Sequence, residues 1–276
     1  MINNPLDDVA AFVCRFSAFP TEYCAPTLAL WYAHTHIADR LYVTPRLILD
    51  SAEPGSGKTR VLEVAQYLVV APEMTVSASR AALFRLVAEG PVTLLFDEVD
   101  TVFRTRTGRS NEDLRAMLNA GYKRSATIPR YDARSRTVRR FPVYAPVALA
   151  GLAGGMPATI TTRAITIHMR RRRSDQQVEP FRERAVEHQA RPIRAALAQW
   201  MAMVAHQVAI AEPVMPAGVT DRSAEIWEPL IAIADAAGDH WPTTARQACR
   251  HFVSTAIRGE GPLDIRLLAD IREVFR

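Results

Sequence analysis

The sequence predicts an α/β protein built on a five-stranded parallel sheet. Short apolar runs alternate with amphipathic, helix-forming segments, which is the pattern of strands joined by helical crossovers on both faces of a sheet. After residue 173 the chain changes to Ala-rich helical segments separated by Pro and Gly, which predicts a small helical bundle. The chain is therefore expected to comprise an N-terminal helical segment (1–45), an α/β core (46–173) and a C-terminal all-α region (174–276).

The expected elements follow from periodicity and from Gly and Pro positions. Apolar residues at helical spacing predict helices within residues 6–42. The expected strands of the core are 47–50, 74–77, 92–97, 145–150 and 164–170, and the expected helices between them are 58–70, 79–89 and about 110–121. The expected C-terminal helices are 178–211, 222–237, 243–258 and 263–275.

The segment between the first strand and the first crossover helix holds the most informative motif. An apolar run, a Gly/Pro/Ser turn and then Gly57-Lys58-Thr59 form the strand–loop–helix context of a phosphate-binding loop. Small residues let backbone N–H groups approach phosphates closely. Lys58 is expected to bridge the β- and γ-phosphates of a nucleotide, and the Thr59 hydroxyl to hold Mg²⁺. Ala52 stands where this motif usually begins with Gly. The expected nucleotide-binding residues are Glu53, Pro54, Gly55, Ser56, Gly57, Lys58, Thr59 and Arg60.

Composition supports a special role for Lys58. Of the 34 basic residues only Lys58 and Lys123 are lysine, and all others are arginine. A compact ammonium suits a phosphate as a point charge, whereas a planar guanidinium suits a fork of two oxygens. A chain that uses Arg almost everywhere therefore retains Lys where this difference matters.

A second motif is an apolar run that ends in Asp97-Glu98. A buried strand would carry Asp97 to its carboxyl end, where open α/β sheets place their ligands. Asp97 is expected to hold the water shell of Mg²⁺, and Glu98 to polarise an attacking water. The motif follows Lys58 after one strand and one helix, and this spacing indicates a hydrolytic site.

Bulk properties exclude several classes of protein. Cys14, Cys24 and Cys249 are odd in number and lie in no C-x-x-C arrangement, which favours free thiols in a reducing cytosol over disulfides or a zinc site. There is no basic-then-apolar leader and no run of 18 apolar residues. We expect a soluble, cytoplasmic protein that has no membrane partner.

Positive charge is concentrated between residues 101 and 140. This segment holds eleven basic and three acidic residues, although the whole chain carries only +5. Such a concentration is typical of a polyanion-binding surface. A solvated, arginine-rich surface without a partner is the alternative.

Strand count, spacing and the trailing helices resemble the AAA+ P-loop ATPases, in which a core sheet is followed by an all-α lid. A narrower resemblance covers almost the whole chain. It is similar to an uncharacterised ATPase family of actinobacterial phages, prophages and plasmids, which in turn is similar to superfamily III replicative helicases. The phrases that carry it include SAEPGSGKTRVLEV, LLFDEVD, LNAGYKRSATIPRY, FPVYAPVALAGL, PATITTRAITIHMRRR and WEPLIAIADAAG.

This resemblance implies cofactors and partners. ATP and Mg²⁺ are the expected cofactors. The expected partners are further copies of the chain in a ring, expected to be a hexamer, together with single-stranded or forked DNA. A primase or an origin-binding protein is a further expected partner, because relatives lie fused to or beside primase–polymerase modules.

The resemblance also implies roles for arginines. A β-hairpin formed by residues 125–144 is expected to project into the ring channel, with Arg130, Arg134 and Arg136 near its tip tracking DNA phosphates. A surface hairpin with incidental arginines is the alternative. Arg163, just before the fifth strand, is expected to act as an arginine finger on a neighbouring subunit, the alternative being a structural salt bridge.

Two points concern the lid and the fourth strand. Arg222 is the expected lid arginine that senses nucleotide, with Arg246 as its competitor. The strand at Val147–Gly151 lacks the Asn or Thr that usually sits near the γ-phosphate in this fold, so either another group replaces it or hydrolysis is slow.

The leading functional hypothesis is a ring-forming, nucleic-acid-stimulated ATPase, a helicase or helicase-like motor in the replication of a phage or other mobile element. An alternative is a nucleotide-switched interaction protein that recruits or blocks host machinery without acting on DNA. A DNA-packaging motor is a third reading, but no nuclease-like carboxylate cluster or second large domain supports it.

Overall fold

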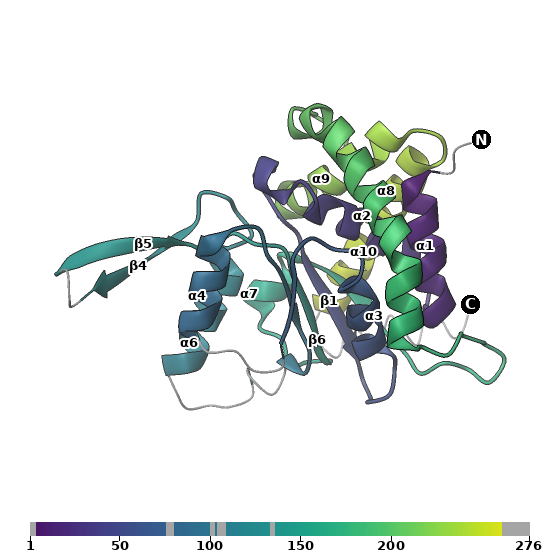
Figure 1. Ribbon diagram of the computed structural model, residues 1–276, viewed down its shortest axis with the longest axis horizontal. Coiled ribbons are helices and arrows are strands. Elements are labelled where there is room, and N and C mark those ends of the chain that lie inside the picture. The colour runs from purple at the N-terminus through teal and green to yellow at the C-terminus, as the bar shows by residue number, and fades with distance from the viewer. Residues whose placement is uncertain (1–3, 76–79, 100–102, 104–108, 133–135, 261–276) are drawn as a thin grey trace.

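A parallel sheet of five strands forms the centre of the molecule (Figure 1). The computed structural model describes residues 4–75, 80–99, 103, 109–132 and 136–260. The sheet order is β2-β3-β6-β1-β7, and every neighbouring pair is parallel. The expected α/β class and five-stranded parallel sheet are thus confirmed. The strands are β1 (Arg46–Ser51), β2 (Pro72–Thr75), β3 (Thr93–Phe96), β6 (Val147–Leu152) and β7 (Ala164–His168).

Both faces of the sheet are buried, which explains why its central strands are continuous apolar runs. All six residues of β1 are buried. Leu47 and Leu49 pack into one hydrophobic cluster, whereas Ile48 between them packs into a second cluster on the opposite face. The helices that connect the strands are α3 (Lys58–Ala65), α4 (Arg80–Glu89), α6 (Arg109–Ala120) and the four-residue α7 (Ala158–Thr161). Of these, α3 covers the first face and the others cover the second.

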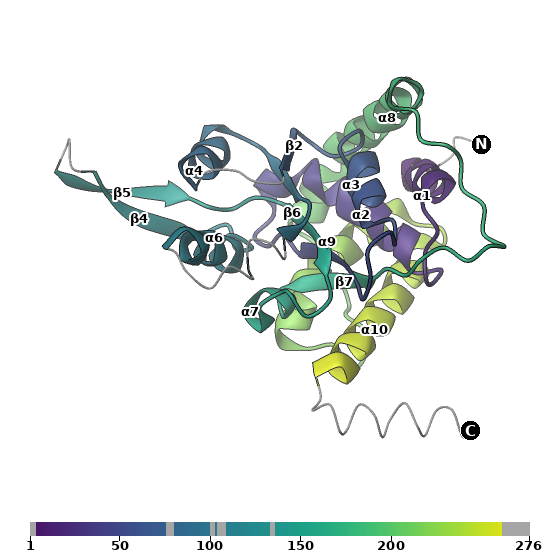
Figure 2. The ribbon, with the colours of Figure 1, turned by 90° about the horizontal axis from the view of Figure 1, so that it is seen from below.

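The N-terminal and C-terminal helices pack together on the face covered by α3. Their side chains form a single hydrophobic cluster with that face of the sheet. Helix α1 packs against α8, α2 packs against α9, and α10 lies beside the edge strand β7 (Figure 2). These elements are α1 (Pro5–Phe16), α2 (Cys24–Thr35), the 3₁₀ helix η1 (Ala38–Arg40), α8 (Glu183–Ala209), α9 (Asp221–Ala237) and α10 (Trp241–Glu260). The helix expected at 263–275 lies outside the described residues.

Helix α3 ends at Ala65 rather than at residue 70, and two other helix boundaries also differ from the sequence expectation. Helix α2 ends at Thr35, after which the N–H groups of His36 and Ile37 form tighter turns onto the carbonyls of Ala33 and His34 at 3.0 and 3.2 Å. The Tyr144 hydroxyl lies 2.9 and 3.0 Å from the carbonyl oxygens of Ala38 and Leu41 in the segment that follows. Helix α8 begins at Glu183 rather than near residue 178. Before it, Glu179 is held by the Arg15 guanidinium at 2.7 Å and by the Arg15 carbonyl, which keeps this stretch out of the helix.

An antiparallel hairpin projects from the body of the molecule (Figure 1). It is formed by β4 (Thr127–Asp132) and β5 (Thr137–Pro142), which confirms the expected hairpin. All described residues of β5 except Phe141 are exposed. Within the described part of the chain, no helix is both long enough and apolar enough to cross a bilayer.

Candidate functional site

The glycine-rich loop joins the central strand β1 to the start of α3. Gly55 and Gly57 have φ of +76° and +88°, a left-handed conformation that favours glycine. Gly57 is also the N-cap of α3 and provides no side-chain cap. The side chain before α3 therefore does not cap its first N–H groups. These groups can donate hydrogen bonds to a bound anion. The loop is exposed except for Ser56, so an anion can reach it from solvent.

The Lys58 ammonium group lies across the base of this loop. It donates to the Ser51 hydroxyl at 2.5 Å and to the Ser56 hydroxyl at 3.2 Å. Ser51 in turn donates to the carbonyl of Glu53 at 2.6 Å. These bonds hold a positive charge beside the uncapped turn of α3. Thr59 follows on an exposed position of the same turn.

Arg171, which sequence reasoning did not single out, contacts the loop. Its Nε donates to the carbonyl of Pro54 at 3.1 Å and lies 3.3 Å from a carboxylate oxygen of Glu53. Glu53 places a negative charge on a loop suited to anions, and Arg171 offsets it. The signal in the sequence was the run Arg170–Arg173 directly after β7, because β7 ends at the same edge of the sheet as β1.

Asp97 and Glu98 follow β3 at this same edge, as expected from their sequence position. Strand β6 alone separates β3 from β1, so at about 4.8 Å per strand the two motifs lie roughly 10 Å apart. The Glu98 N–H donates to Oδ1 of Asp97 at 3.0 Å. Glu98 is exposed and has φ of +53°, a costly backbone conformation for a residue with a side chain. Strained backbone conformations of this kind occur most often at functional sites.

Thr59 and Asp97 carry oxygen atoms of the kind that hard metal ions take as ligands. One hydroxyl and one carboxylate suit Mg²⁺, which retains water and takes its remaining ligands from phosphate. No cluster of three or more His, Cys, Asp or Glu side chains with metal-binding geometry occurs among the described residues. A metal at this edge would therefore depend on a bound phosphate for some of its ligands.

The structure does not bring Arg163, Arg222 or Arg246 to the loop. Arg163 precedes β7, and its carbonyl accepts from the N–H of Arg46 at the start of β1, the end opposite to the loop. Arg222 lies at that same end, 3.5 Å from the Thr162 hydroxyl. Arg246 is held by Asp235 at 2.5 and 2.8 Å within the helical layer. Within one chain, neither Arg222 nor Arg246 therefore lies beside the glycine-rich loop, and the role of a lid arginine that senses nucleotide stays a prediction.

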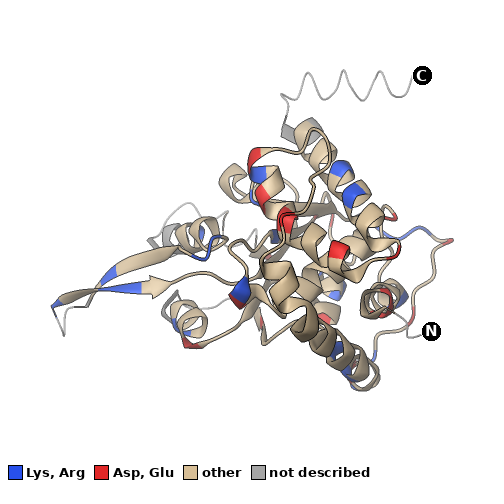
Figure 3. Ribbon diagram, turned by 90° about the horizontal axis from the view of Figure 1, so that it is seen from above, with Lys and Arg blue, Asp and Glu red and all other residues tan. Residues whose placement is uncertain are grey.

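Of the three arginines expected near the hairpin tip, the structure describes Arg130 and Arg136. Arg130 lies on β4, with its guanidinium carbon 5.2 Å from the ring centroid of Phe84, and Arg136 is exposed at the start of the return strand. Arg134 lies outside the described residues. The register adds a residue that the sequence did not reveal, because Arg139 on β5 stands directly opposite Arg130. Figure 3 shows basic segments on both strands of the hairpin.

The structure also joins two residues that the sequence left unremarked. His168 Nδ1 at the end of β7 lies 2.6 Å from Oδ1 of Asp50, which directly precedes Ser51 in β1. The pairing Asp50↔His168 in the sheet register produces this contact. It links the two strand ends beside the glycine-rich loop.

The chain is similar to proteins whose descriptions name no activity. A family described as a protein of unknown function, DUF3631, matches residues 168–276. An uncharacterized 28.9 kDa protein in the xis 5′ region of Saccharopolyspora erythraea is 40% identical over 108 residues, covering 39% of this chain. The chain spans 40% of the length of that relative. The family match begins at His168, so it takes in the helices α8 to α10 but not the glycine-rich loop or Asp97-Glu98.

Proposed function

We propose that this chain is an ATP-hydrolysing P-loop motor of the AAA+ type that acts as a ring and is stimulated by nucleic acid. One observation carries the proposal. The glycine-rich loop, with the Lys58 ammonium at its base, lies at the same sheet edge as Asp97 and Glu98. Strand β6 lies between the two strands that carry these motifs. This spacing leaves room for a triphosphate and Mg²⁺ between a phosphate-binding loop and a pair of carboxylates.

Each residue then has a distinct task. The uncapped N–H groups of α3 and Lys58 bind and orient the phosphates. Thr59 and Asp97 hold Mg²⁺, which supplies charge neutralisation on the β- and γ-phosphate oxygens. Glu98 accepts a proton from the attacking water. The strained backbone at Glu98 is consistent with a carboxylate that is held away from the sheet and toward solvent.

The hairpin is the proposed contact with DNA. Arg130 and Arg139 stand directly opposite each other in the hairpin register, so two cationic side chains lie on one face of this ladder. Exposed Tyr131, on the opposite face of the hairpin from the Arg130/Arg139 pair, offers a ring on which a base can stack. Phosphate contact plus stacking suits a single strand without sequence preference. The function inferred is a helicase or helicase-like motor in the replication of a mobile element.

The experiment that tests this function measures Mg²⁺-dependent ATP hydrolysis with and without single-stranded DNA, together with native mass. We expect hydrolysis that DNA stimulates and a mass above that of one chain when an ATP analogue is bound. ATP turnover without any response to DNA would favour the interaction-protein alternative. Absence of ATP binding would refute the P-loop assignment itself.

The hairpin contact can be tested in the same assay. Replacing Arg136 and Arg139 with Ala should abolish DNA stimulation and flatten the salt dependence of DNA binding, because each phosphate contact contributes a slope of about −0.7 in log K against log[salt] on a single strand. Basal hydrolysis should persist, because the hairpin is remote from Lys58. Arg191→Ala on exposed α8 is the matched control. Identical slopes for the double variant and wild type would exclude these arginines as the DNA contact.

Arg171 is expected to support nucleotide binding through Glu53. Arg171→Ala should weaken binding of a fluorescent ATP analogue by about tenfold, the scale of one charge-assisted hydrogen bond, because the Glu53 carboxylate then repels the phosphates. Adding Glu53→Gln to that variant should restore much of the affinity. Equal losses in the single and double variants would show that Arg171 does not act through Glu53.

A further inference from the structure

Strand β7 forms an open edge of the central sheet. It stands last in the sheet order, and no other described strand pairs with its outer side. Its inner side bonds to β1, since the carbonyl of Arg163 accepts from β1 at 3.0 Å and the N–H of Met169 donates to the carbonyl of Asp50 at 2.7 Å. Because the backbone groups of successive residues in a strand point to opposite sides, the residues at even-numbered positions face outward. These residues are Ala164, Thr166 and His168.

Two of these residues offer unpaired backbone groups. Within the part of the chain that the structure describes, the N–H and C=O groups of Ala164 and Thr166 have no hydrogen-bond partner. Such a row of donors and acceptors is a template for a further strand, and natural proteins often block it with Lys, Pro or a covering element. The sequence of β7 contains neither Lys nor Pro. The edge of β7 is therefore able to pair with another extended segment.

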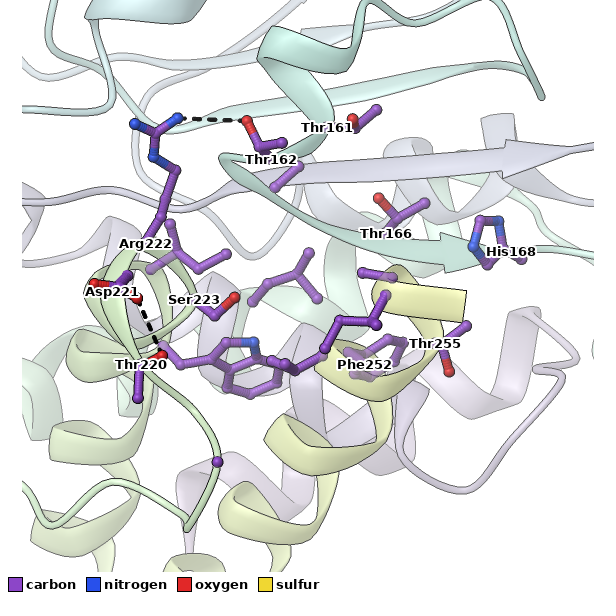
Figure 4. A pocket seen from close by; sticks show the side chains of 18 of the residues that line it. Thr161, Thr162, Thr166, His168, Thr220, Asp221, Arg222, Ser223, Phe252 and Thr255 are labelled. Carbon is purple, nitrogen blue, oxygen red and sulfur yellow. Dashed lines mark hydrogen bonds between the residues drawn. The ribbon is translucent and has the colours of Figure 1, made fainter. Parts of the chain in front are cut away.

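A pocket of about 470 Å³ runs along this edge (Figure 4). Strand β7 lines one side of the pocket, and the start of α9 and the last turns of α10 line the other side. Figure 4 shows Thr166 and His168 across the pocket from Phe252 and Thr255. Strand β7 has five residues, so at about 3.3 Å per residue an extended segment of roughly the same length would cover this edge.

The wall opposite β7 is largely apolar. Ile226 and Trp227 of α9 and Phe252 of α10 line it. Ile257, near the end of α10, also lines it and is 66% exposed. Exposed apolar surface in a groove with a polar rim is typical of an interaction site. Because alternate side chains of a strand lie on one face, an added strand with apolar residues at every second position would cover this wall.

The end of the pocket at the start of β7 carries positive charge. Nη1 of Arg222 lies 3.5 Å from the Thr162 hydroxyl oxygen, as drawn in Figure 4, and Nη1 of Arg163 lies 3.4 Å from the same oxygen. Arg222 has no ion-pair partner among the described residues, and the adjacent Asp221 instead accepts from the Thr220 hydroxyl at 3.1 Å. A guanidinium fork matches the two oxygens of a carboxylate. An acidic side chain therefore complements this end of the pocket.

We propose that an extended segment of a partner protein adds to the edge of β7 as a sixth strand of the sheet. The segment pairs its backbone with Ala164 and Thr166, covers the apolar wall with alternate side chains and places an acidic residue beside Arg222. In this mode of recognition, backbone pairing supplies affinity and the pocket walls supply selectivity. A second copy of the chain fits less well, because its own β7 edge is flanked by α9 and α10. The inference does not depend on the proposed function, since no residue of the glycine-rich loop lines the pocket.

The test starts from the full chain and a random library of short peptides. We expect the enriched peptides to alternate apolar with polar residues and to carry an acidic residue at one end. A synthetic peptide of this kind should slow hydrogen exchange at the amides of Ala164 and Thr166 when it binds. The amides of Ile165 and Ile167 face β1, so they should exchange slowly with and without the peptide and serve as internal controls.

Two variants at Thr166 separate backbone pairing from side-chain contact. Thr166→Pro removes an N–H that faces away from β1, a change that an edge strand tolerates, and it should weaken binding of the selected peptide by about tenfold or more. Thr166→Val retains this N–H and should bind the peptide as wild type does. Thermal unfolding verifies that the proline variant is folded.

Two further variants test the pocket walls without any change to β7. Ile257→Asp should weaken peptide binding by about tenfold, the scale of one lost apolar contact. Ile210→Asp is the matched control, because Ile210 is 67% exposed at the end of α8 and outside the pocket. Arg222→Glu should lose the acidic peptide and bind a version in which Lys replaces the acidic residue.

Four outcomes would overturn the inference. The first is that no peptide is enriched, and the second is that enriched peptides leave exchange at Ala164 and Thr166 unchanged because they bind elsewhere. The third is equal loss of binding in Thr166→Pro and Thr166→Val, which would make the side chain the contact. The fourth is slow exchange of both amides without peptide, which would mean that the edge is already covered, by a second copy if the protection rises with protein concentration.

Discussion

Glu98→Gln is expected to bind ATP as wild type does and to hydrolyse it about 10²- to 10⁴-fold more slowly, the range for removal of a general base. The amide retains the size and hydrogen-bonding reach of the carboxylate but cannot accept the proton of the attacking water. Since Glu98 is exposed and its backbone N–H already binds Asp97, the substitution should leave the fold and the Asp97 side chain in place. Single-turnover hydrolysis and binding of an ATP analogue measure the two effects separately.

Lys58→Ala provides the contrast for this prediction. It should lose nucleotide affinity itself, because the ammonium group held between Ser51 and Ser56 is the fixed positive charge of the loop. Glu89→Gln, at the exposed end of α4, is the matched carboxylate control and should hydrolyse ATP normally. If Glu98→Gln and wild type hydrolyse ATP at equal rates, the general base is a different group.

Arg163→Ala is expected to lower hydrolysis by roughly 10³-fold or more at saturating ATP, the scale for removal of an arginine finger. Arg163 lies at the end of β7 opposite to the loop, so in the proposed ring it would act on a nucleotide bound to another copy. The loss should therefore appear in the turnover of the assembled protein and not in ATP binding by an isolated chain. Mixing with Lys58→Ala should restore part of the activity.

The alternative for Arg163 is a structural role, since it contacts the Thr159 carbonyl and the ring of Tyr122. Thermal unfolding separates the two. If Arg163 is an arginine finger, its replacement should leave the unfolding temperature nearly unchanged. If Arg163 is structural, its replacement should lower the unfolding temperature, and mixing should not restore activity. Monomeric mass with a bound ATP analogue, together with no rescue, would exclude action between subunits.

Local signals predicted a large part of this fold. The strands of the core were evident because a strand buried on both faces must be apolar throughout, as β1 is. The loop was evident because its left-handed turns at Gly55 and Gly57 need glycine. The hairpin and the change to helical segments after the core are likewise predicted by residues that are adjacent in the chain. In each case the physical requirement acts on residues close together in the chain.

Contacts between distant segments were not predicted. Arg171 reaches Glu53 because β7 pairs beside β1, and Arg139 faces Arg130 because of the hairpin register. The first and last thirds of the chain share one hydrophobic cluster, although the sequence suggested separate segments. The placement of Arg222 depends on how α9 packs on α2, which no local pattern encodes.

Residue type and spacing along the chain are therefore enough to predict which groups at the loop can bind phosphate or a metal. The surroundings of the arginines depend instead on tertiary packing. A long guanidinium side chain is compatible with many surfaces, and its partner depends on strand order, register and helix packing. Arg163 and Arg222 meet at Thr162 because β7 and α9 are brought together across 60 residues of chain.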